Sequence, residues 1–179
     1  MMSRIAKAGL VLIGTLALLG CATAPVLDAG TGGKAFVPEV FFRGTTHAEG
    51  EFVNVIDGSR RGVKAVINGR FDGKVLTLVE DFTYSDGETD RKTWHLTKTG
   101  PTTYSGTRED VIGTAQGRLD GPNFRLTYQA SVKTKTSSYD LTFDDVLGLQ
   151  PDGSVLNRAV VSKLGIKIGD ITLVIRKRR

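Results

Sequence analysis

Three charged residues lie where an alternating pattern places apolar side chains. The rows are Leu76, Leu78, Glu80, Phe82 and Tyr84; Tyr139, Leu141, Phe143, Asp145, Leu147 and Leu149; and Leu156, Arg158 and Val160. A buried carboxylate is costly unless it is protonated or paired. We therefore expect Arg158 to pair with Asp145 or Glu80 inside the fold, as a polar floor or as the group that recognises the polar end of a ligand. The alternative is that bulges turn these residues outward, or that the pair only fixes strand register.

Two aromatic residues are further candidates for a binding site. Trp94, the only tryptophan, lies on the opposite face of its strand from Arg91, and Tyr128 shares an apolar face with Phe124 and Leu126. Such large rings form core, and the alternative is that they line a pocket. The candidate ligand-binding residues are Glu80, Trp94, Tyr128, Asp145 and Arg158.

Motifs for catalysis, metals and phosphates are missing from the sequence. His47 and His95 are the only histidines, and neither has a metal-ligand spacing to another ligand residue. No Gly-x-Ser-x-Gly nucleophile motif is present. Glu80 with Asp145 could form an acid/base pair, but any two carboxylates of a β protein fit that description. We therefore expect no enzyme activity, no cofactor and no bound metal.

The single cysteine, Cys21, ends an N-terminal targeting segment. Arg4 and Lys7 precede an apolar run from Ala8 to Leu19, which is typical of a secretory signal and shorter than the roughly 20 residues that span a bilayer. Leu18-Leu19-Gly20-Cys21 resembles a bacterial lipobox, which implies cleavage before Cys21 and an anchor of two acyl chains on its thiol. The alternative is an ordinary free cysteine after a cleaved signal. Ala22 in place of Asp suggests, by resemblance to Gram-negative lipoproteins, an outer-membrane location facing the periplasm.

Charge and composition limit the partners. Loss of residues 1–20 removes Arg4 and Lys7 and lowers the formal charge of +5 by two. The remaining chain suffices for one domain, and one cysteine excludes an internal disulfide. The tail 176–179 (Arg-Lys-Arg-Arg) either lies against anionic headgroups or keeps the last strand soluble. Basic residues do not interleave with aromatic ones, so nucleic acid is not an expected partner, and the sequence identifies no protein partner.

Tight-turn signals divide most of the chain into strands. Residues 21–46 resemble a tether, in which Val37 to Phe42 is the first piece that we expect to dock on the domain. Beyond it, five Asp-Gly pairs, which favour hairpin turns, separate stretches with period two. The expected strands are His47–Ile56, Gly62–Phe71, Lys74–Ser85, Arg91–Thr99, Thr102–Arg108, Ile112–Leu119, Asn123–Lys133, Tyr139–Leu149, Val155–Lys163 and Lys167–Lys177. The stretch Val155–Leu164 also fits a short helix.

So many consecutive antiparallel strands expose two edges unless the sheet closes on itself. We predict an all-β fold over residues 47–179, an antiparallel up-and-down barrel of about 8–10 strands that is lipocalin-like. A two-sheet β-sandwich is the alternative.

Several short motifs follow one another along the chain. They are Phe41-Phe42-x-Gly44, Glu80-x-Phe82-x-Tyr84-x-Asp86-Gly87-Glu88, Arg91-x-x-Trp94, Tyr104-x-Gly106-x-x-x-Asp110-Val111-x-Gly113-x-Ala115-x-Gly117, Asp144-Asp145, and Asn157-Arg158 with Lys163 and Gly165. In this order they resemble an uncharacterised family of proteobacterial lipoproteins, the domain-of-unknown-function family 3833. The resemblance implies a lipid-anchored envelope protein with no known catalytic residues.

These observations predict an outer-membrane lipoprotein whose barrel binds a hydrophobic or lipid-like small molecule. The alternative is a non-enzymatic interaction or structural module, whose barrel is filled with side chains and docks on an envelope partner. A cavity of roughly several hundred Å³ would favour the first function. An exposed apolar patch without a cavity would favour the second.

Overall fold

The alternating stretches form ten antiparallel strands in the computed structural model, which describes residues 23–27, 35–134 and 136–177. The stretch Val155–Leu164, which also fitted a short helix, forms the strand Val155–Lys163. The strands are β1 (Gly44–Asn54), β2 (Arg60–Phe71), β3 (Val75–Tyr84), β4 (Thr89–Lys98), β5 (Thr103–Thr107), β6 (Val111–Asp120), β7 (Asn123–Lys133), β8 (Ser138–Leu149), β9 (Val155–Lys163) and β10 (Ile166–Lys177).

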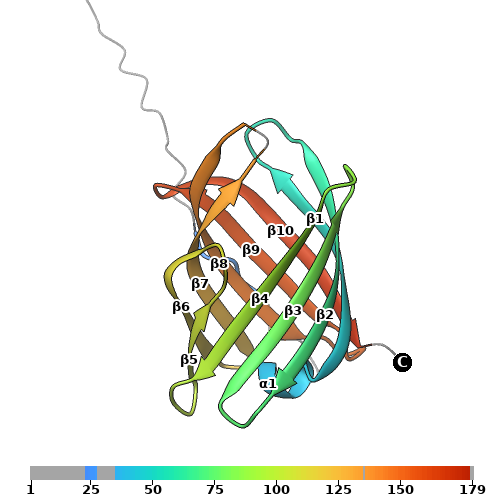
Figure 1. Ribbon diagram of the computed structural model, residues 1–179, viewed down its shortest axis with the longest axis vertical. Helices are drawn as coiled ribbons and strands as arrows, with labels where there is room; N and C mark the ends of the chain where they lie inside the picture. Colours follow the sequence, from blue (N-terminus) through green and yellow to red (C-terminus); the bar gives the residue numbers. More distant parts are fainter. Residues whose placement is uncertain (1–22, 28–34, 135, 178–179) are drawn as a thin grey trace, which may run out of the picture.

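The sheet closes into a barrel because β1 pairs with both β2 and β10 (Figure 1). The β1–β10 pairing runs from Thr46 opposite Lys177 to Asn54 opposite Gly169. Each other strand pairs with its neighbours in sequence, so the described chain forms one up-and-down ring without a free edge. The predicted lipocalin-like barrel is confirmed, and the sandwich alternative is wrong.

Asp-Gly turns set the two ends of the barrel. Asp72 accepts hydrogen bonds from the backbone N–H groups of Lys74 (2.9 Å) and Val75 (2.8 Å), and Gly73 takes φ +104°, which glycine adopts without strain. This turn lies at the end that we call the base. We call the opposite end, which holds the β1–β2, β3–β4, β7–β8 and β9–β10 turns, the mouth (Figure 1).

A single helical turn, α1 (Pro38–Phe41), closes the base. The rings of Phe36, Phe41 and Phe42 meet edge to face with centroids 5.2–6.0 Å apart, and Phe36 lies 6.5 Å from Phe124 of β7. All four rings are buried. The segment that leads into β1 thus plugs the barrel with apolar surface.

A buried carboxylate fastens this plug to the wall. Glu39 of α1 is 6% exposed and accepts hydrogen bonds from Lys98 Nζ at 2.7 Å and from the Tyr104 hydroxyl at 2.8 Å. Burial alone would raise the pKa of Glu39, but these hydrogen bonds lower it below its usual value. The carboxylate is therefore charged and paired, so α1 is joined to β4 and β5.

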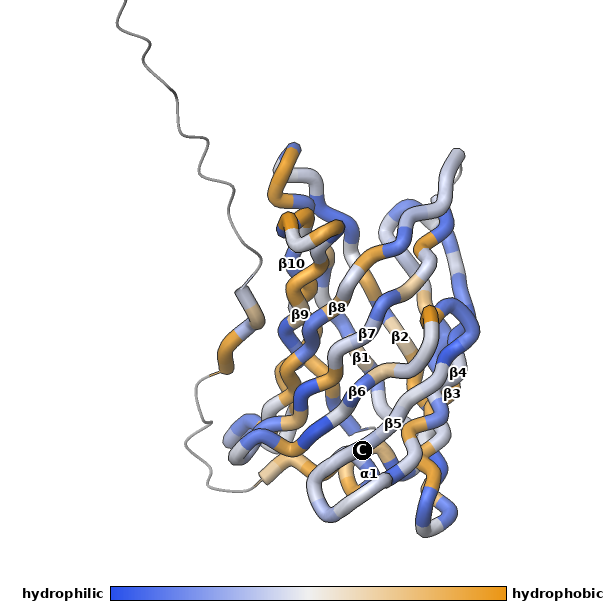
Figure 2. Tube along the Cα trace, turned by 90° about the vertical axis from the view of Figure 1, so that its left-hand side faces the viewer, coloured by the Kyte–Doolittle hydropathy of each residue, from blue (hydrophilic) through white to orange (hydrophobic). Residues whose placement is uncertain are grey.

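A second N-terminal segment, residues 23–27, lies alongside the outer wall (Figure 2). Arg125 Nη1 donates to the carbonyl oxygen of Pro25 at 3.0 Å, and Leu27 is buried beside Gly148. No described helix is long and apolar enough to cross a membrane. The predicted signal segment 1–20, Cys21, Arg178 and Arg179 lie outside the described residues.

Candidate functional site

The barrel encloses a cavity of about 1030 Å³. Ligand pockets commonly measure roughly 300–1,000 Å³, so the alternative of a barrel filled with side chains does not agree with this volume. The cavity extends from Phe42 at the base to Glu88 and Lys133, which are exposed at the mouth. Its lower wall is apolar and includes Ala48, Ile67, Leu78, Leu96, Phe124, Leu126, Leu147 and Ile175.

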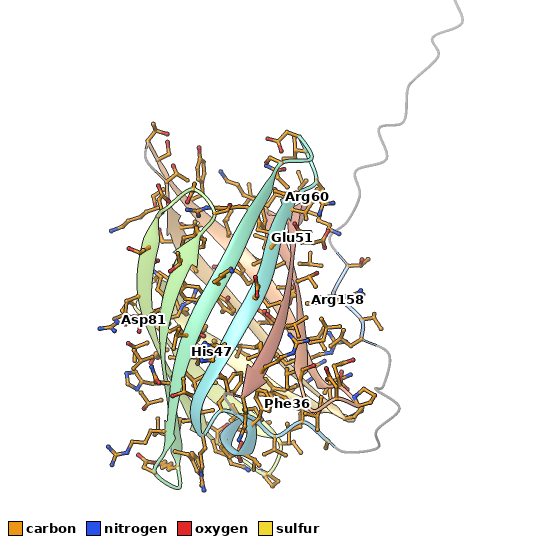
Figure 3. The ribbon with its side chains drawn as sticks, turned by 90° about the vertical axis from the view of Figure 1, so that its right-hand side faces the viewer. Phe36, His47, Glu51, Arg60, Asp81 and Arg158 are labelled. Carbon is orange, nitrogen blue, oxygen red and sulfur yellow. The ribbon has the colours of Figure 1, made fainter. Side chains whose placement is uncertain are left out.

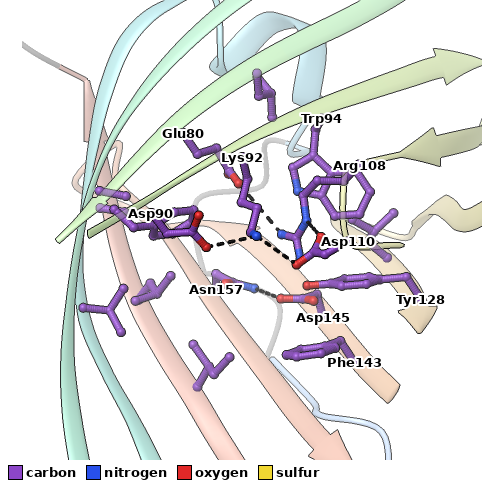
Figure 4. A pocket seen from close by; sticks show the side chains of 18 of the residues that line it. Glu80, Asp90, Lys92, Trp94, Arg108, Asp110, Tyr128, Phe143, Asp145 and Asn157 are labelled. Atoms are coloured by element: carbon purple, nitrogen blue, oxygen red, sulfur yellow. Dashed lines mark hydrogen bonds and ion pairs between the residues drawn. The ribbon is translucent and has the colours of Figure 1, made fainter. Parts of the chain in front are cut away.

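A cluster of charged residues lies in the cavity next to this apolar wall, and we call it the polar band (Figure 4). Its members are Glu80 of β3, Lys92 of β4, Arg108 and Asp110 of the β5–β6 connection, and Asp145 of β8. Arg108 Nε lies 2.7 Å from Asp110 Oδ1, and Arg108 Nη1 lies 3.9 Å from Glu80 Oε2. Lys92 Nζ lies 3.4 Å from Asp110 and 3.0 Å from Asp90. The described residues hold no group of three or more His, Cys, Asp or Glu arranged for a metal ion.

Three aromatic rings flank the polar band. Trp94 and Tyr128 meet edge to face at 5.1 Å, and Tyr128 stacks on Phe143 at 4.9 Å. The guanidinium of Arg108 lies 4.7 Å from the Trp94 centroid and 5.2 Å from that of Tyr128. Aromatic faces attract cations, so the rings help to hold Arg108 charged inside the barrel.

Burial changes the protonation of two carboxyl groups in the band. It raises the pKa of Glu80 to about 7, although the positive charge of Arg108 opposes the rise. It raises the pKa of Asp145 to about 6, although a hydrogen bond from Asn157 Nδ2 (2.9 Å) and the charge of Arg108 oppose this change. Burial would lower the pKa of Arg108, but the neighbouring Tyr128, Asp110 and Glu80 raise it overall. Near neutral pH, Arg108 is therefore charged, while Glu80 and Asp145 have pKa values close to the pH of the solution.

Four of the five candidate ligand-binding residues line the cavity. Glu80, Trp94, Tyr128 and Asp145 come from strands β3, β4, β7 and β8, and the closed sheet brings them to one level (Figure 4). Glu80 and Asp145 line the same cavity although their strands, β3 and β8, are not neighbours in the sheet. The alternation within each strand was sufficient to find these residues.

The fifth candidate, Arg158, is not part of the site. It is exposed on the outer wall (Figure 3), where it pairs in register with Val146 and Thr172. The expected ion pair with Asp145 or Glu80 is therefore wrong. The inward positions of β9 are Asn157, Ala159 and Val161, and Asn157 takes the place beside Asp145 that we expected for Arg158.

The reason for this error is that β9 is apolar on both faces. Val160, on the outer face, is only 5% exposed, and Val161, on the inner face, is 2% exposed. Alternation identifies the inner face of a strand only where the other face is polar. The sequence of β9 therefore fits either set of alternate residues pointing inward, and we chose the set that contains Arg158.

Sequence reasoning missed the central cation of the band, Arg108. A usable signal existed, because Tyr104, Gly106 and Arg108 alternate and continue the inward face of β5. The carboxylate of Asp110, two residues further on, pairs with Arg108. Lys92, Phe143 and Asn157 were also not proposed as site residues.

Comparisons with known proteins add a fold relative. No curated protein matches the sequence. The solved structure of the S-type phycobiliprotein lyase CPES from Guillardia theta is similar, with a TM-score of 0.57 at 8% sequence identity, over 79% of this chain and 91% of that chain. At this identity the likeness shows the fold alone.

This relative corrects one prediction. We expected no enzyme activity because familiar catalytic motifs are missing, but a protein with a similar barrel is named as a lyase. The expectation of no enzyme activity is therefore contradicted. Missing catalytic motifs do not distinguish this barrel from a similar barrel that is named as a lyase.

A family model extends over nearly all of the described chain. It matches residues 15–177, which include α1, all ten strands and the polar band. The resemblance seen in short motifs thus holds along the barrel, and the chain belongs to the family described as "Protein of unknown function (DUF3833)".

Proposed function

We propose that this protein binds a small amphipathic molecule, such as a lipid, inside the barrel. The observation that carries the proposal is the cavity of about 1030 Å³ with an apolar lower half and a polar band above it. An apolar tail would lie between the band and the plug at Phe42, and the polar end would meet Glu80, Arg108 and Asp145. The mouth, where Glu88 and Lys133 are exposed, is the entrance.

The single tryptophan provides a direct test. Trp94 is the only tryptophan in the chain and lies in the cavity wall, so its fluorescence reports on the cavity and not on the N-terminal apolar run. Titration of the full chain with dodecanol should change Trp94 emission saturably, and native mass spectrometry should show one added molecule. A chain that shows neither change would contradict the proposal.

Two matched substitutions locate the binding. Ala48→Phe adds a ring on an inward, buried position of β1 that lines the cavity, and it should weaken dodecanol binding by at least about tenfold, since the tail loses its space. Val66→Phe adds the same ring bulk on an outward, 37% exposed position of β2, and it should leave binding unchanged. Thermal unfolding confirms that both variants fold, and Ala65→Phe replaces the first variant if it does not. Equal binding by all folded variants would contradict a site inside the barrel.

We also propose that the protein is a periplasm-facing lipoprotein of the outer membrane, anchored through acylated Cys21. The lipobox-like sequence supports this proposal. The contact of Pro25 with Arg125 on the outer wall is compatible with it, since Pro25 lies four residues after Cys21 in the sequence. A cavity for lipid-like molecules suits a protein held at a membrane.

Processing in cells tests the anchor. Globomycin, which blocks cleavage of lipoprotein signals, should make a precursor that retains residues 1–20 accumulate, and palmitate label should enter the chain. Cys21→Ser should abolish both effects. Palmitate labelling that persists in Cys21→Ser, or processing that ignores globomycin, would contradict the anchor without affecting the cavity.

Catalysis on the bound molecule is a second candidate function, and the shared position of Glu80 and Asp145 favours it. Both groups line one cavity, and burial raises the pKa of Glu80 to about 7, near the value that suits a general acid at neutral pH. Amphiphiles extracted with the protein from cells should then change in mass on incubation, and Glu80→Gln should stop the change. Unaltered masses would leave binding as the function.

A further inference from the structure

Both cations of the polar band are already paired with carboxylates. Lys92 Nζ lies between Asp90 and Asp110, at 3.0 and 3.4 Å. Arg108 binds Asp110 through Nε at 2.7 Å and through Nη2 at 3.3 Å. Its guanidinium group also lies over the rings of Trp94 and Tyr128. An anionic ligand group would therefore have to share Arg108 with Asp110, through Nη1, and would lie near the carboxyl group of Glu80, which is 3.9 Å from that nitrogen.

The acidic side of the band is not balanced in the same way. Glu80 has Arg108 at 3.9 Å, and that cation is shared with Asp110. Within the described part of the chain, no lysine or arginine lies at ion-pair distance from Asp145, whose hydrogen bonds come from two neutral groups, the amide of Asn157 and the hydroxyl of Tyr128. The band thus holds one more carboxyl group than it can pair with its own cations.

We propose, on the basis of the binding function above, that the ligand carries a positively charged polar end, an ammonium or quaternary ammonium group, which lies beside Asp145 and Glu80. A buried carboxylate requires a proton or an opposite charge, and a ligand cation supplies the missing charge. The stacked rings of Tyr128 and Phe143 present aromatic surface next to Asp145, which also favours a cation. The apolar tail then points toward the base.

This assignment links binding to proton release. The groups that act on Glu80 and Asp145 from the surrounding strands and loops are Lys92 and Asp90 of β4, Arg108, Glu109 and Asp110 of the β5–β6 connection, Tyr128 of β7, and Asp144 of β8. At low pH both carboxyl groups are protonated and a cation meets no negative charge. As the pH rises, a bound cation replaces a proton, so affinity for a cationic ligand rises with pH.

Amphiphiles with the same tail and different polar ends separate the effect of charge on binding from the effect of the tail. We would titrate the full chain with dodecyltrimethylammonium, dodecanol and dodecanoate below micelle formation, and follow Trp94 emission. At about pH 7.5 the cation should bind at least about tenfold more tightly than dodecanoate, since an unpaired buried carboxylate favours one sign of charge. Its advantage should shrink at about pH 5, where Glu80 and Asp145 are protonated.

A pair of adjacent aspartates supplies the control. Asp145→Asn removes the inward carboxylate that has no ion-pair partner, and it should cut affinity for the cation by at least about fivefold, a larger loss than any change in affinity for dodecanol. Asp144→Asn removes the neighbouring carboxylate, which accepts a hydrogen bond from Thr127 Oγ1 and does not line the cavity, and it should lower cation affinity much less than Asp145→Asn does.

The outcomes separate the two proposals. Equal binding of all three amphiphiles, or tightest binding of dodecanoate, would overturn the cationic ligand and leave the binding function intact. Loss of cation affinity in Asp144→Asn but not in Asp145→Asn would also overturn it. Failure of every amphiphile to alter Trp94 emission would overturn the binding function itself.

Discussion

Arg108 is the residue on which the charge balance of the cavity depends. Its side chain is 11% exposed and holds Asp110, which is 15% exposed, at 2.7 Å. Removal of one partner of a buried ion pair leaves an uncompensated charge, which costs about 3–5 kcal/mol. Because Lys92 still lies 3.4 Å from Asp110 in this variant, we expect Arg108→Met to lower the free energy of unfolding in urea by less than this, about 1–3 kcal/mol near neutral pH. The double variant Arg108→Met/Asp110→Asn should recover much of the loss, and no recovery would show that Arg108 acts mainly through its packing on the rings.

Glu80 makes the stability of the barrel depend on pH. Its pKa rises on folding from 4.5 to about 7, so the folded state binds more protons than the unfolded state between these values. The free energy of unfolding should therefore fall as the pH rises through this window, by about 3 kcal/mol at most for this group. Glu80→Gln should flatten the curve of urea stability between about pH 4.5 and pH 7. Parallel curves for Glu80→Gln and the parent would contradict the raised pKa.

The success of sequence reasoning at this scale depended on the contrast between the faces of each strand. Glu80 and Tyr128 lie in rows with one polar face, so their inward position could be predicted. Arg158 lies in β9, which is apolar on both faces, and the prediction failed there. Arg108 lies just beyond the end of β5, where a pattern of period two no longer guarantees the direction of a side chain.

At the scale of elements, α1 is held by a small polar contact that can be weakened in steps. Tyr104→Phe removes one hydrogen bond to Glu39 and should cost about 1 kcal/mol of unfolding free energy. Glu39→Ala also removes the contact with Lys98 and should cost about 1–3 kcal/mol. Urea unfolding followed by circular dichroism measures both. A larger cost for Tyr104→Phe than for Glu39→Ala would mean that Tyr104 supports the barrel mainly through its ring, which lies 5.2 Å from Phe124.

The elements themselves could be predicted where they are long and repetitive. The ten expected strands are present, and glycine marks most of the turns between them but not the β5–β6 and β7–β8 connections. Alternation over several residues identified the strands, but α1 has four residues, too few to show helical periodicity. Glycines within strands have two roles. Gly113 takes φ +72° at an irregularity in the β6–β7 pairing, whereas a Cβ at Gly117 would lie 2.8 Å from Phe124, so this glycine makes room for a ring.

In the whole molecule, closure of the sheet brings the inward residues of separate strands into one site. The inward residues of a single strand do not form a site, but the closed barrel places Glu80 and Asp145 in the same cavity above the plugged base. The sequence could predict closure from the number of strands and the cost of free edges. It could not predict the cavity, because its volume depends on how the side chains of all ten strands fill the interior.

Leu27 is the buried residue of the segment 23–27 that lies on the outer wall of the barrel. Leu27 is 8% exposed, whereas Val26 beside it is 66% exposed. Leu27→Asp should therefore release residues 23–27 from the outer wall, since a buried apolar contact is replaced by a charge. Limited digestion of the full chain with proteinase K should then cut within this segment faster than in the parent, while the melting temperature of the barrel stays within about 2 °C, because a surface segment contributes little to the core. Val26→Asp should change neither measurement. Faster cutting in Val26→Asp would mean that exposure alone controls the segment, and a large fall in melting temperature for Leu27→Asp would mean that residues 23–27 fold as part of the barrel wall.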